Sequence, residues 1–288
     1  MRDFTDRVAV ITGGASGVGR ALGEQLARAG AKVVLADIDQ ARLDATAAEI
    51  GTETGADVTG VKVDVTKAES VAALADTVWA RHGAIHLLFN NAGVGLGEAQ
   101  KALWSLPAND WHWGFDVNVF GVVYGIQAFV PRMLASGEEG VVINTSSSNG
   151  GLRSLPNTPI YAASKAAVTS ISEVLYQQLL REGERVRAAV LFPGPHVVNT
   201  SILASKRNRP ADYGDDDGNK PAYETMEDLV RTTGLKMALT EPDEVAAFAL
   251  EGIRAGRFWL IPESDDNDHK LSERMSGLLA RVNPVSAW

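Results

Sequence analysis

Short, uninterrupted runs of apolar and β-branched residues constrain the fold of this chain more than any other feature. Seven such runs begin at Val8, Lys32, Gly60, Ile85, Gly140, Val186 and Arg257. Most of them lack the alternation of apolar and polar residues that is typical of a strand with one solvent-exposed face. They therefore predict strands covered on both sides, as in a parallel sheet. Alanine-rich helical stretches such as 17–29 and 40–50 separate them. The pattern predicts an α/β fold, a single-domain doubly wound parallel sheet of about seven strands with helices on both faces.

Composition narrows the class of protein. The 288 residues are 45% hydrophobic, which allows a large core, and they carry a net charge of −9 without a basic stripe. Nucleic acid and anionic membrane are therefore not expected as partners. The chain has no cysteine, so disulfides, thiolate zinc sites and cysteine nucleophiles are excluded.

Targeting and membrane signals are not found in the sequence. The first residues lack a signal-peptide core, and no segment stays apolar for about 18 residues. We expect a cytoplasmic protein. The acidic runs 215–217 and 265–268 do not match a calcium loop, so they predict solvated surface and no metal site.

The regular alternation of predicted strands and helices indicates one main domain, residues 1–262. A polar, turn-rich stretch at 205–220 interrupts this domain, within a substrate-loop or lid insertion expected at about 201–238. The alternative for the stretch is a merely solvated, partly disordered insertion. Residues 263–288 continue past the last strand and have apolar side chains at helical spacing, which predicts a C-terminal helical extension.

A glycine-rich turn follows the first predicted strand and opens the first helix. The segment "TGGASGVG" has glycines at 13, 17 and 19, with Ser16 and Val18 between them. Glycine allows a tight turn and a close backbone approach to a pyrophosphate, and the helix N-terminus offers free N–H groups to that anion. This order of strand, turn and helix predicts a Rossmann-type dinucleotide site.

Polar and small residues at three further strand ends fit the same ligand. Asp37 closes the second strand, where a carboxylate accepts hydrogen bonds from ribose hydroxyls and repels a 2′-phosphate, which favours NAD over NADP. Asp64 is expected to end the third strand and, with Val65, to contact the adenine. Asn91, Ala92 and Gly93 follow the fourth strand, where small residues let the backbone approach the cofactor.

Tyr161 and Lys165 in "YAASK" lie four residues apart, on one face of a predicted helix. A phenol with an ordinary pKa of about 10 is a poor acid–base group at neutral pH. A nearby ammonium favours the phenolate and brings the phenol closer to the working pH. The pair predicts a proton-transfer site.

Two polar residues accompany this pair. Ser148 lies at the end of the preceding strand and is expected to hold the substrate oxygen beside the phenol, although serine-rich strand ends are also common turns. Asn118 lies inside an apolar helix, where a buried amide needs partners. It is expected to carry a water linked to Lys165, with a kink cap as the alternative.

The motifs "TGGASGVG", "NNAG", Asn118, Ser148, "YAASK" and Pro193–Gly194 occur in the order and approximate spacing of one family. From Thr5 to Pro262 the chain resembles the short-chain dehydrogenase/reductase family. The resemblance implies a catalytic set of Asn118, Ser148, Tyr161 and Lys165, a bound nicotinamide cofactor, which Asp37 favours as NAD, and a homodimer or homotetramer. It also implies cofactor contacts from Pro193, Gly194 and Thr200, although Thr200 comes later after Pro193–Gly194 than is usual in the family.

The implied activity is an NAD-dependent exchange between a secondary alcohol and a ketone. The pocket is expected at Gly150, Leu155, His196 and Val197, together with Ser148 and Tyr161. With no cation firmly placed to bind an anionic substrate, a bulky, uncharged, aromatic or steroid-like alcohol is expected. The extended tail is similar to that of bacterial dehydrogenases of lignin-type aryl alcohols.

Two other functions share parts of this pattern. A non-catalytic NAD(H)-binding redox sensor could use the same scaffold, because fold does not determine function. A sugar-nucleotide epimerase also uses Y-x-x-x-K, but such enzymes resemble this chain less in their glycine turn and in their larger C-terminal domain.

Overall fold

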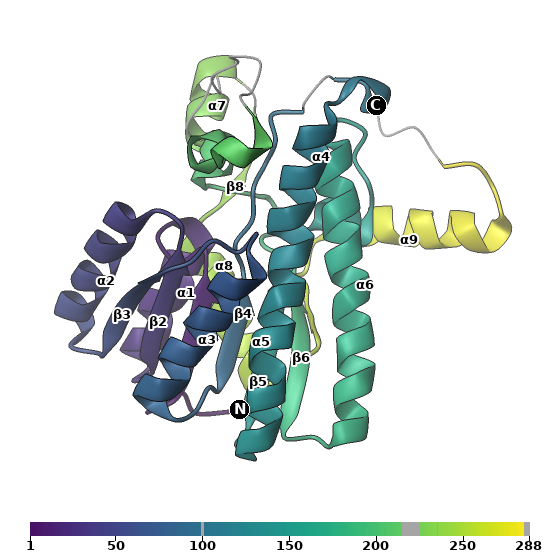
Figure 1. Cartoon of the computed structure of the whole chain (residues 1–288). Coiled ribbons are helices and arrows are strands. Elements are labelled where there is room, and N and C mark those ends of the chain that lie inside the picture. The colour runs from purple at the N-terminus through teal and green to yellow at the C-terminus, as the bar shows by residue number, and fades with distance from the viewer. Residues whose placement is uncertain (99–100, 215–224, 235, 285–288) are drawn as a thin grey trace.

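The computed structural model describes residues 1–98, 101–214, 225–234 and 236–284. In these residues a seven-stranded parallel sheet has the order β3-β2-β1-β4-β5-β6-β9 (Figure 1). Its strands are β1 (Val8–Thr12), β2 (Lys32–Asp37), β3 (Val58–Lys62), β4 (Leu87–Asn90), β5 (Gly140–Thr145), β6 (Val186–Leu191) and β9 (Trp259–Leu260). The predicted doubly wound α/β fold is confirmed.

Strand β1 shows why the apolar runs lack alternation. All five of its residues are buried. Val8 and Val10 belong to the core on one side of the sheet, while Ala9 and Ile11 belong to the core on the other. Because side chains alternate between the faces of a strand, a strand covered by helices on both faces must be apolar throughout.

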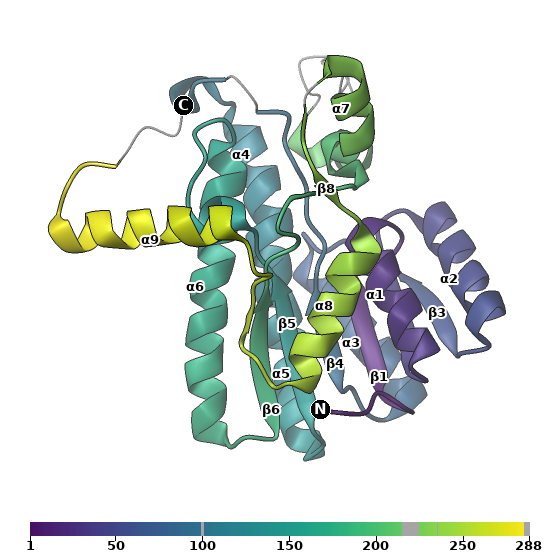
Figure 2. The same ribbon diagram turned by 180° about the vertical axis from the view of Figure 1, so that it is seen from behind.

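Helices cover both faces of the sheet. One layer holds α1 (Gly17–Arg28), α2 (Gln40–Thr54) and α8 (Pro242–Arg254), and α1 and α8 pack side by side (Figure 2). The other layer holds α3 (Ala68–His82), α5 (Gly121–Ser136) and α6 (Pro159–Glu182) (Figure 1). A large apolar core therefore lies on each side of the sheet.

Helix α5 continues a longer helical run. Helix α4 (Ala108–Phe115) leads through a π-helical turn, η2 (Asp116–Phe120), into α5. Within the described residues, the run Ala108–Ser136 is long and apolar enough to cross a membrane by length and composition alone. Here it packs against α3, α6 and strands β4 and β5, so part of its apolar surface belongs to the protein core.

Two elements differ from expectation. Strand β3 begins and ends earlier than the predicted run from Gly60, so Asp64 lies beyond the strand and does not end it. Val63 still donates its N–H to the carbonyl of Asp37, which keeps the chain beside β2 for one more residue. A separate two-stranded pairing of β7 (Val197–Val198) and β8 (Leu239–Thr240) was not predicted, because each strand has only two residues.

Several short elements gather beyond the carboxyl edge of the sheet (Figure 1). These are η1 (Leu103–Ser105), η3 (Ser148–Leu152), η4 (Ser201–Asn208), η5 (Ala211–Tyr213) and α7 (Met226–Thr233). The C-terminal helix α9 (Asp265–Ala280) starts next to η3 and extends away from the body in both views (Figures 1 and 2). The acidic run 215–217 and the end of the predicted 205–220 loop lie outside the described residues.

Candidate active site

A cavity of about 890 Å³ opens at the carboxyl edge of the sheet. The loops that follow β1 to β5 line it, together with the segment after β6, helix η4 and the start of α9. Ligands of open α/β sheets bind in the crevice at this edge. The volume is at the upper end of the range for ligand pockets, so there is room for a large ligand or for two.

The glycine turn makes one end of this cavity. A side chain at Gly19 would have its Cβ 2.1 Å from the carbonyl oxygen of Gly13, so glycine is required where the turn closes on itself. Gly13 and Gly17 have positive φ angles of 69° and 53°. Ser16 precedes α1 without capping it, which leaves the first N–H groups of that helix free of a side-chain partner. Gly13, Ser16, Gly17 and Val18 line the cavity, and the N-terminus of α1 fits an anion such as a pyrophosphate.

Two carboxylates lie beside this end. Asp37 accepts backbone N–H groups of Ala15 and Asp39, each at 3.1 Å, and is half-buried at the end of β2. Asp64 accepts the N–H and the hydroxyl of Thr66, at 3.0 and 2.7 Å. Both carboxylates have fixed positions on the cavity wall, where Asp37 suits the ribose hydroxyls of a dinucleotide.

The remaining predicted cofactor residues lie near the same cleft. Val65, Asn91, Ala92, Gly93, Pro193 and Thr200 line the cavity. Thr200 is close to the glycine turn, since a Cβ at Gly17 would be 3.1 Å from its methyl group. Gly19 and Gly194 are not among the described lining residues and instead shape the backbone turns around the cavity.

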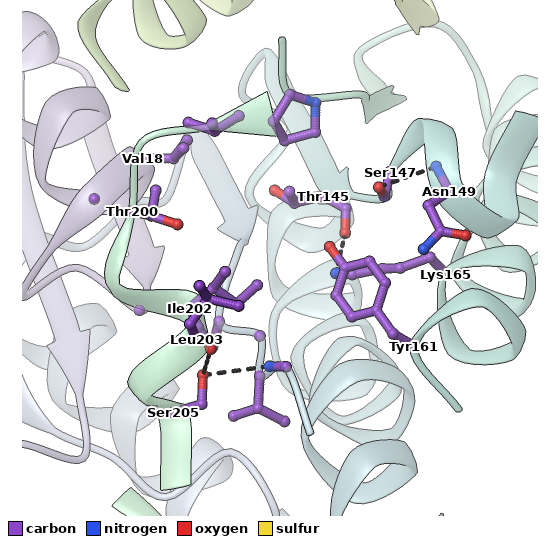
Figure 3. A pocket seen from close by; sticks show the side chains of 18 of the residues that line it. Val18, Thr145, Ser147, Asn149, Tyr161, Lys165, Thr200, Ile202, Leu203 and Ser205 are labelled. Carbon is purple, nitrogen blue, oxygen red and sulfur yellow. Dashed lines mark hydrogen bonds between the residues drawn. The ribbon is translucent and has the colours of Figure 1, made fainter. Parts of the chain in front are cut away.

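Tyr161 and Lys165 project from the first turns of α6 into the middle of the cavity (Figure 3). The Lys165 ammonium is buried, donates to the backbone carbonyl of Thr145 at 2.8 Å and lies 5.7 Å from the centre of the Tyr161 ring. Burial lowers the pKa of Lys165 to about 8. The predicted i, i+4 pairing on one helix face is therefore present in the structure.

The pKa of the Tyr161 phenol, in the protein chain by itself, differs from the expectation. Burial raises the pKa of Tyr161, and a hydrogen bond with the Ser147 side chain only partly opposes this shift. Lys165 directs its ammonium to the Thr145 carbonyl. The cation therefore does not outweigh the desolvation of the phenol.

The hydroxyl beside the phenol comes from Ser147, one residue before the predicted Ser148. Ser147 is in extended backbone before η3, and its Oγ also accepts the N–H of Asn149 at 3.2 Å (Figure 3). Ser148 begins the tight η3 turn and lines the cavity, but it is not among the groups that shift the pKa of Tyr161. The turn beyond β5 decides which serine meets the phenol.

Asn118 lies in the π-helical turn η2, behind the cavity, and is fully buried. Its Oδ1 accepts the N–H of Val94 at 2.8 Å. Its Nδ2 donates to the carbonyl of Val94 at 3.2 Å and to the hydroxyl of Ser164 at 3.0 Å. The side chain thus ties η2 to the loop after β4 and to α6, so any water relay would have to use its backbone.

The other end of the cavity contains most of the predicted substrate residues. Leu155, His196 and Val197 line it. Gly150 does not belong to the described lining: it faces α6, where an added Cβ would lie 2.1 Å from the carbonyl of Ala162. Its φ of 99° permits the turn that presents Ser147.

Sequence reasoning missed several residues of the site. Ser147, Glu98 and the α9 residues Asp266, Asn267 and Lys270 all line the cavity. A run of three serines gave a signal for Ser147 without selecting it. Nothing in the local sequence indicates that Glu98 or the C-terminal helix α9 lines the cavity, because both reach the site through tertiary packing.

Comparisons with known proteins agree with this geometry. Residues 7–211 match the family model described as short chain dehydrogenase. A short-chain dehydrogenase/reductase from Burkholderia phymatum, solved in complex with NAD, is 37% identical, with a TM-score of 0.89 over 100% of this chain and 99% of that one.

Two curated relatives add to this. The C alpha-dehydrogenase of Sphingobium sp. strain SYK-6 is 32% identical over 100% of this chain and 90% of its own length. The 1-deoxy-11-beta-hydroxypentalenate dehydrogenase of Streptomyces exfoliatus is 36% identical over 90% of this chain and 84% of its own. The chain belongs to the short-chain dehydrogenase/reductase family and is an oxidoreductase with a nicotinamide cofactor.

Proposed function

We propose that this protein is an NAD-dependent enzyme that interconverts a secondary alcohol and a ketone. The observation that carries the proposal is the convergence of Tyr161, Lys165 and Ser147 on one cavity that also contains the glycine turn and Asp37. A phenol, an ammonium and a hydroxyl at the carboxyl edge of the sheet can hold an alcohol oxygen and move its proton.

Each residue has a role in alcohol oxidation. The Tyr161 phenolate accepts the hydroxyl proton while the carbinol carbon loses a hydride, and the reverse steps reduce a ketone. Ser147, in place of the expected Ser148, donates a hydrogen bond to the substrate oxygen. Lys165 holds positive charge near the phenolate, and Asn118 keeps the supporting loop in place. When bound, the nicotinamide cofactor takes up or returns the hydride.

Asp37 supports NAD as the cofactor. A carboxylate at the end of this strand repels a 2′-phosphate, and two backbone N–H groups hold that of Asp37 in place. The Burkholderia phymatum neighbour, which matches over the full chain, is bound to NAD. Asp64, Val65 and the Asn91–Gly93 loop would complete the cofactor site, with Thr200 next to the pyrophosphate end.

The substrate is proposed to be bulky and uncharged, aromatic or steroid-like. Apolar side chains such as Leu155, Val197 and Ile202 line its end of the cavity. Arg153 and Lys270 also line it, but Lys270 pairs with Asp266, and the charge of Arg153 helps to lower the pKa of the same carboxylate. This pairing of charges supports a neutral ligand. The relative named for 1-deoxy-11-beta-hydroxypentalenate supports a hydroxyl group as the site of reaction, although that compound is itself a carboxylate.

The proposed function also includes a lid, a role for the C-terminal helix and an oligomeric state. The described parts of the segment 201–238, which are 201–214, 225–234 and 236–238, would act as a lid over the substrate, and α9 would complete the wall beside η3. Exposed apolar residues on the long helices, among them Phe120, Val174 and Leu180, support a homodimer or homotetramer. A cytoplasmic location stays a prediction.

The test is turnover of a panel of aromatic and steroidal secondary alcohols with NAD⁺ and with NADP⁺, followed by NADH absorbance. We expect oxidation of at least one bulky neutral alcohol, faster with NAD⁺. Tight NADH binding without turnover of any alcohol or ketone would instead support the alternative, a redox sensor on the same fold.

A further inference from the structure

Glu98 is a buried carboxylate that the family motifs do not include. It lies in the loop that follows β4, and 2% of its surface is exposed. Its Oε2 accepts the N–H of Ile160 at 2.7 Å, and its Oε1 accepts the N–H of Tyr161 at 2.9 Å. Carboxylates are almost never buried without partners, and here the partners belong to the backbone of the catalytic helix.

These two N–H groups are donors that a helix cannot satisfy by itself. Helix α6 begins at Pro159, so Ile160 and Tyr161 lie in its first turn, where backbone N–H groups have no intrahelical acceptor. Thr158 occupies the N-cap position but makes no side-chain cap hydrogen bond. Glu98, 62 residues earlier than Ile160, therefore takes the place of the missing cap. Its negative charge also suits the positive end of the helix dipole.

The loop of Glu98 connects four parts of the site. Val94 donates to Asn118, and Gly95 donates to the hydroxyl of Ser205 on η4, at 2.8 and 3.3 Å. A Cβ at Gly93 would lie 3.5 Å from the Lys165 ammonium nitrogen. One short segment thus touches the π-helical turn, the lysine, the proposed lid and, through Glu98, the tyrosine.

The hydrogen bonds of the Glu98 carboxylate favour a role in positioning Tyr161 over a direct role in proton transfer to the substrate. Each oxygen of Glu98 accepts one backbone N–H group, so the carboxylate is directed at the helix backbone, and the described hydrogen bonds do not join it to the Tyr161 hydroxyl. The carboxylate can, however, hold the backbone of Tyr161 in place. An error of about 1 Å in the position of a reacting group can lower a rate roughly 100-fold.

We propose that Glu98 is a positioning residue that fixes the first turn of α6 and thereby the phenol of Tyr161. The inference rests on the proposed function of Tyr161 as acid–base group. Glu98 would tie that group to the loop that also meets the cofactor cleft and the lid.

The kinetic test compares Glu98→Gln and Glu98→Asp with the wild type. The amide of glutamine offers one acceptor oxygen in place of two, so one of the two N–H bonds is lost. We expect kcat to fall about 10- to 100-fold while KM for NAD⁺ stays within about twofold, since the cofactor contacts remain. Aspartate keeps both acceptors on a shorter side chain and should recover part of the loss.

The solvent isotope effect on kcat distinguishes positioning from general loss of structure. It should rise in Glu98→Gln, because a displaced phenol slows proton transfer. The control is Ile253→Val in the core of α8, a small loss of core packing that does not touch the site. The control should leave kcat and the isotope effect unchanged. An unchanged isotope effect in Glu98→Gln, or a loss of kcat no larger than in the control, would refute the proposal.

Amide hydrogen exchange gives a readout that needs no substrate. Exchange at Ile160 and Tyr161 should accelerate in Glu98→Gln, while that at Arg42, whose N–H is capped by Asp39 at the start of α2, should not change. Equal exchange rates in wild type and variant would show that Glu98 does not hold the helix. Faster exchange in Glu98→Gln, together with a wild type that turns over no alcohol, would mean that the proposed function has failed while the structural role of Glu98 stands.

Discussion

The ammonium of Lys165 donates a 2.8 Å hydrogen bond to the backbone carbonyl of Thr145, the last residue of β5. This bond ties α6 to the carboxyl edge of the sheet and places the charge 5.7 Å from the centre of the Tyr161 ring. Burial of the ammonium disfavours its charged form, as its lowered pKa shows. Buried charged groups of this kind cluster at functional sites, where their charge has a specific role.

Replacing Tyr161 by phenylalanine should remove the acid–base group and keep the ring. We expect kcat/KM for alcohol oxidation to fall about 100- to 10,000-fold, with NADH affinity nearly unchanged, as measured by fluorescence titration. Tyr176→Phe is the matched control, since Tyr176 lies on the same helix and packs its ring against Phe258. Near-normal turnover in Tyr161→Phe would contradict the proposed mechanism.

Ser147→Ala and Ser148→Ala test which serine holds the substrate oxygen. The Ser147 side chain opposes the raised pKa of the phenol, so its loss should lower kcat about 100-fold, whereas Ser148→Ala should stay within about threefold. Steady-state kinetics of the two variants decide between the residues. The reverse order of effects would restore Ser148 to the role that the sequence suggested.

Lys165→Met should abolish most turnover and yet raise stability at neutral pH. The folded pKa of about 8 lies below the ordinary value of 10.5, so the unfolded chain binds more protons between these values. Burial of the charge therefore costs up to about 3 kcal/mol below pH 8, a cost that disappears as the pH rises toward 10.5.

Urea unfolding of both proteins at several pH values measures this. The stability advantage of Lys165→Met, reduced by the lost hydrogen bond to Thr145, should shrink steadily above pH 8. Lys62→Met, at an exposed position, should show no such trend. A gap between Lys165→Met and wild type that is independent of pH would show that the ammonium is not desolvated.

Asp37→Asn should weaken the choice of NAD over NADP. The amide no longer repels a 2′-phosphate and accepts ribose hydroxyls less well, since hydrogen bonds to charged groups contribute about 1.5–3 kcal/mol. The ratio of kcat/KM for NAD⁺ to that for NADP⁺ should therefore drop about 10- to 100-fold. An unchanged ratio would mean that another residue selects the cofactor.

Arg209→Met should loosen the proposed lid. Arg209 follows η4 and pairs with Asp110 on α4 at 2.6 Å, with both side chains less than 10% exposed. Its loss leaves a buried carboxylate unpaired, which we expect to cost about 3 kcal/mol of stability and to raise KM for the alcohol.

Two comparison variants separate these effects. Adding Asp110→Leu should recover stability, because no charge is left unpaired, while KM stays high. Arg231→Gln breaks an exposed pair with Asp228 and should change neither quantity measurably. An unaltered KM in Arg209→Met would argue against a lid function for this segment.

Much of the site could be predicted because its signals are local. The glycine turn, Asp37 and the Tyr161–Lys165 pair each depend on a few neighbouring residues whose strand or helix is evident from apolar periodicity. Ser147 could not be selected over Ser148, because the choice depends on the backbone turn at Asn149 and Gly150. The raised pKa of Tyr161 was also beyond reach, since it depends on how deeply the fold buries the phenol.

The layered α/β fold follows from the amino-acid pattern, since only a sheet covered on both faces can bury runs such as Val8–Thr12, and the same pattern identifies the helix that carries the tyrosine and lysine. Three features depend on how distant segments pack: Glu98 caps this helix, α9 reaches the cavity, and both polar atoms of the Asn118 side chain have partners. These contacts join residues far apart in the chain, and their energies arise only when packing excludes water between them.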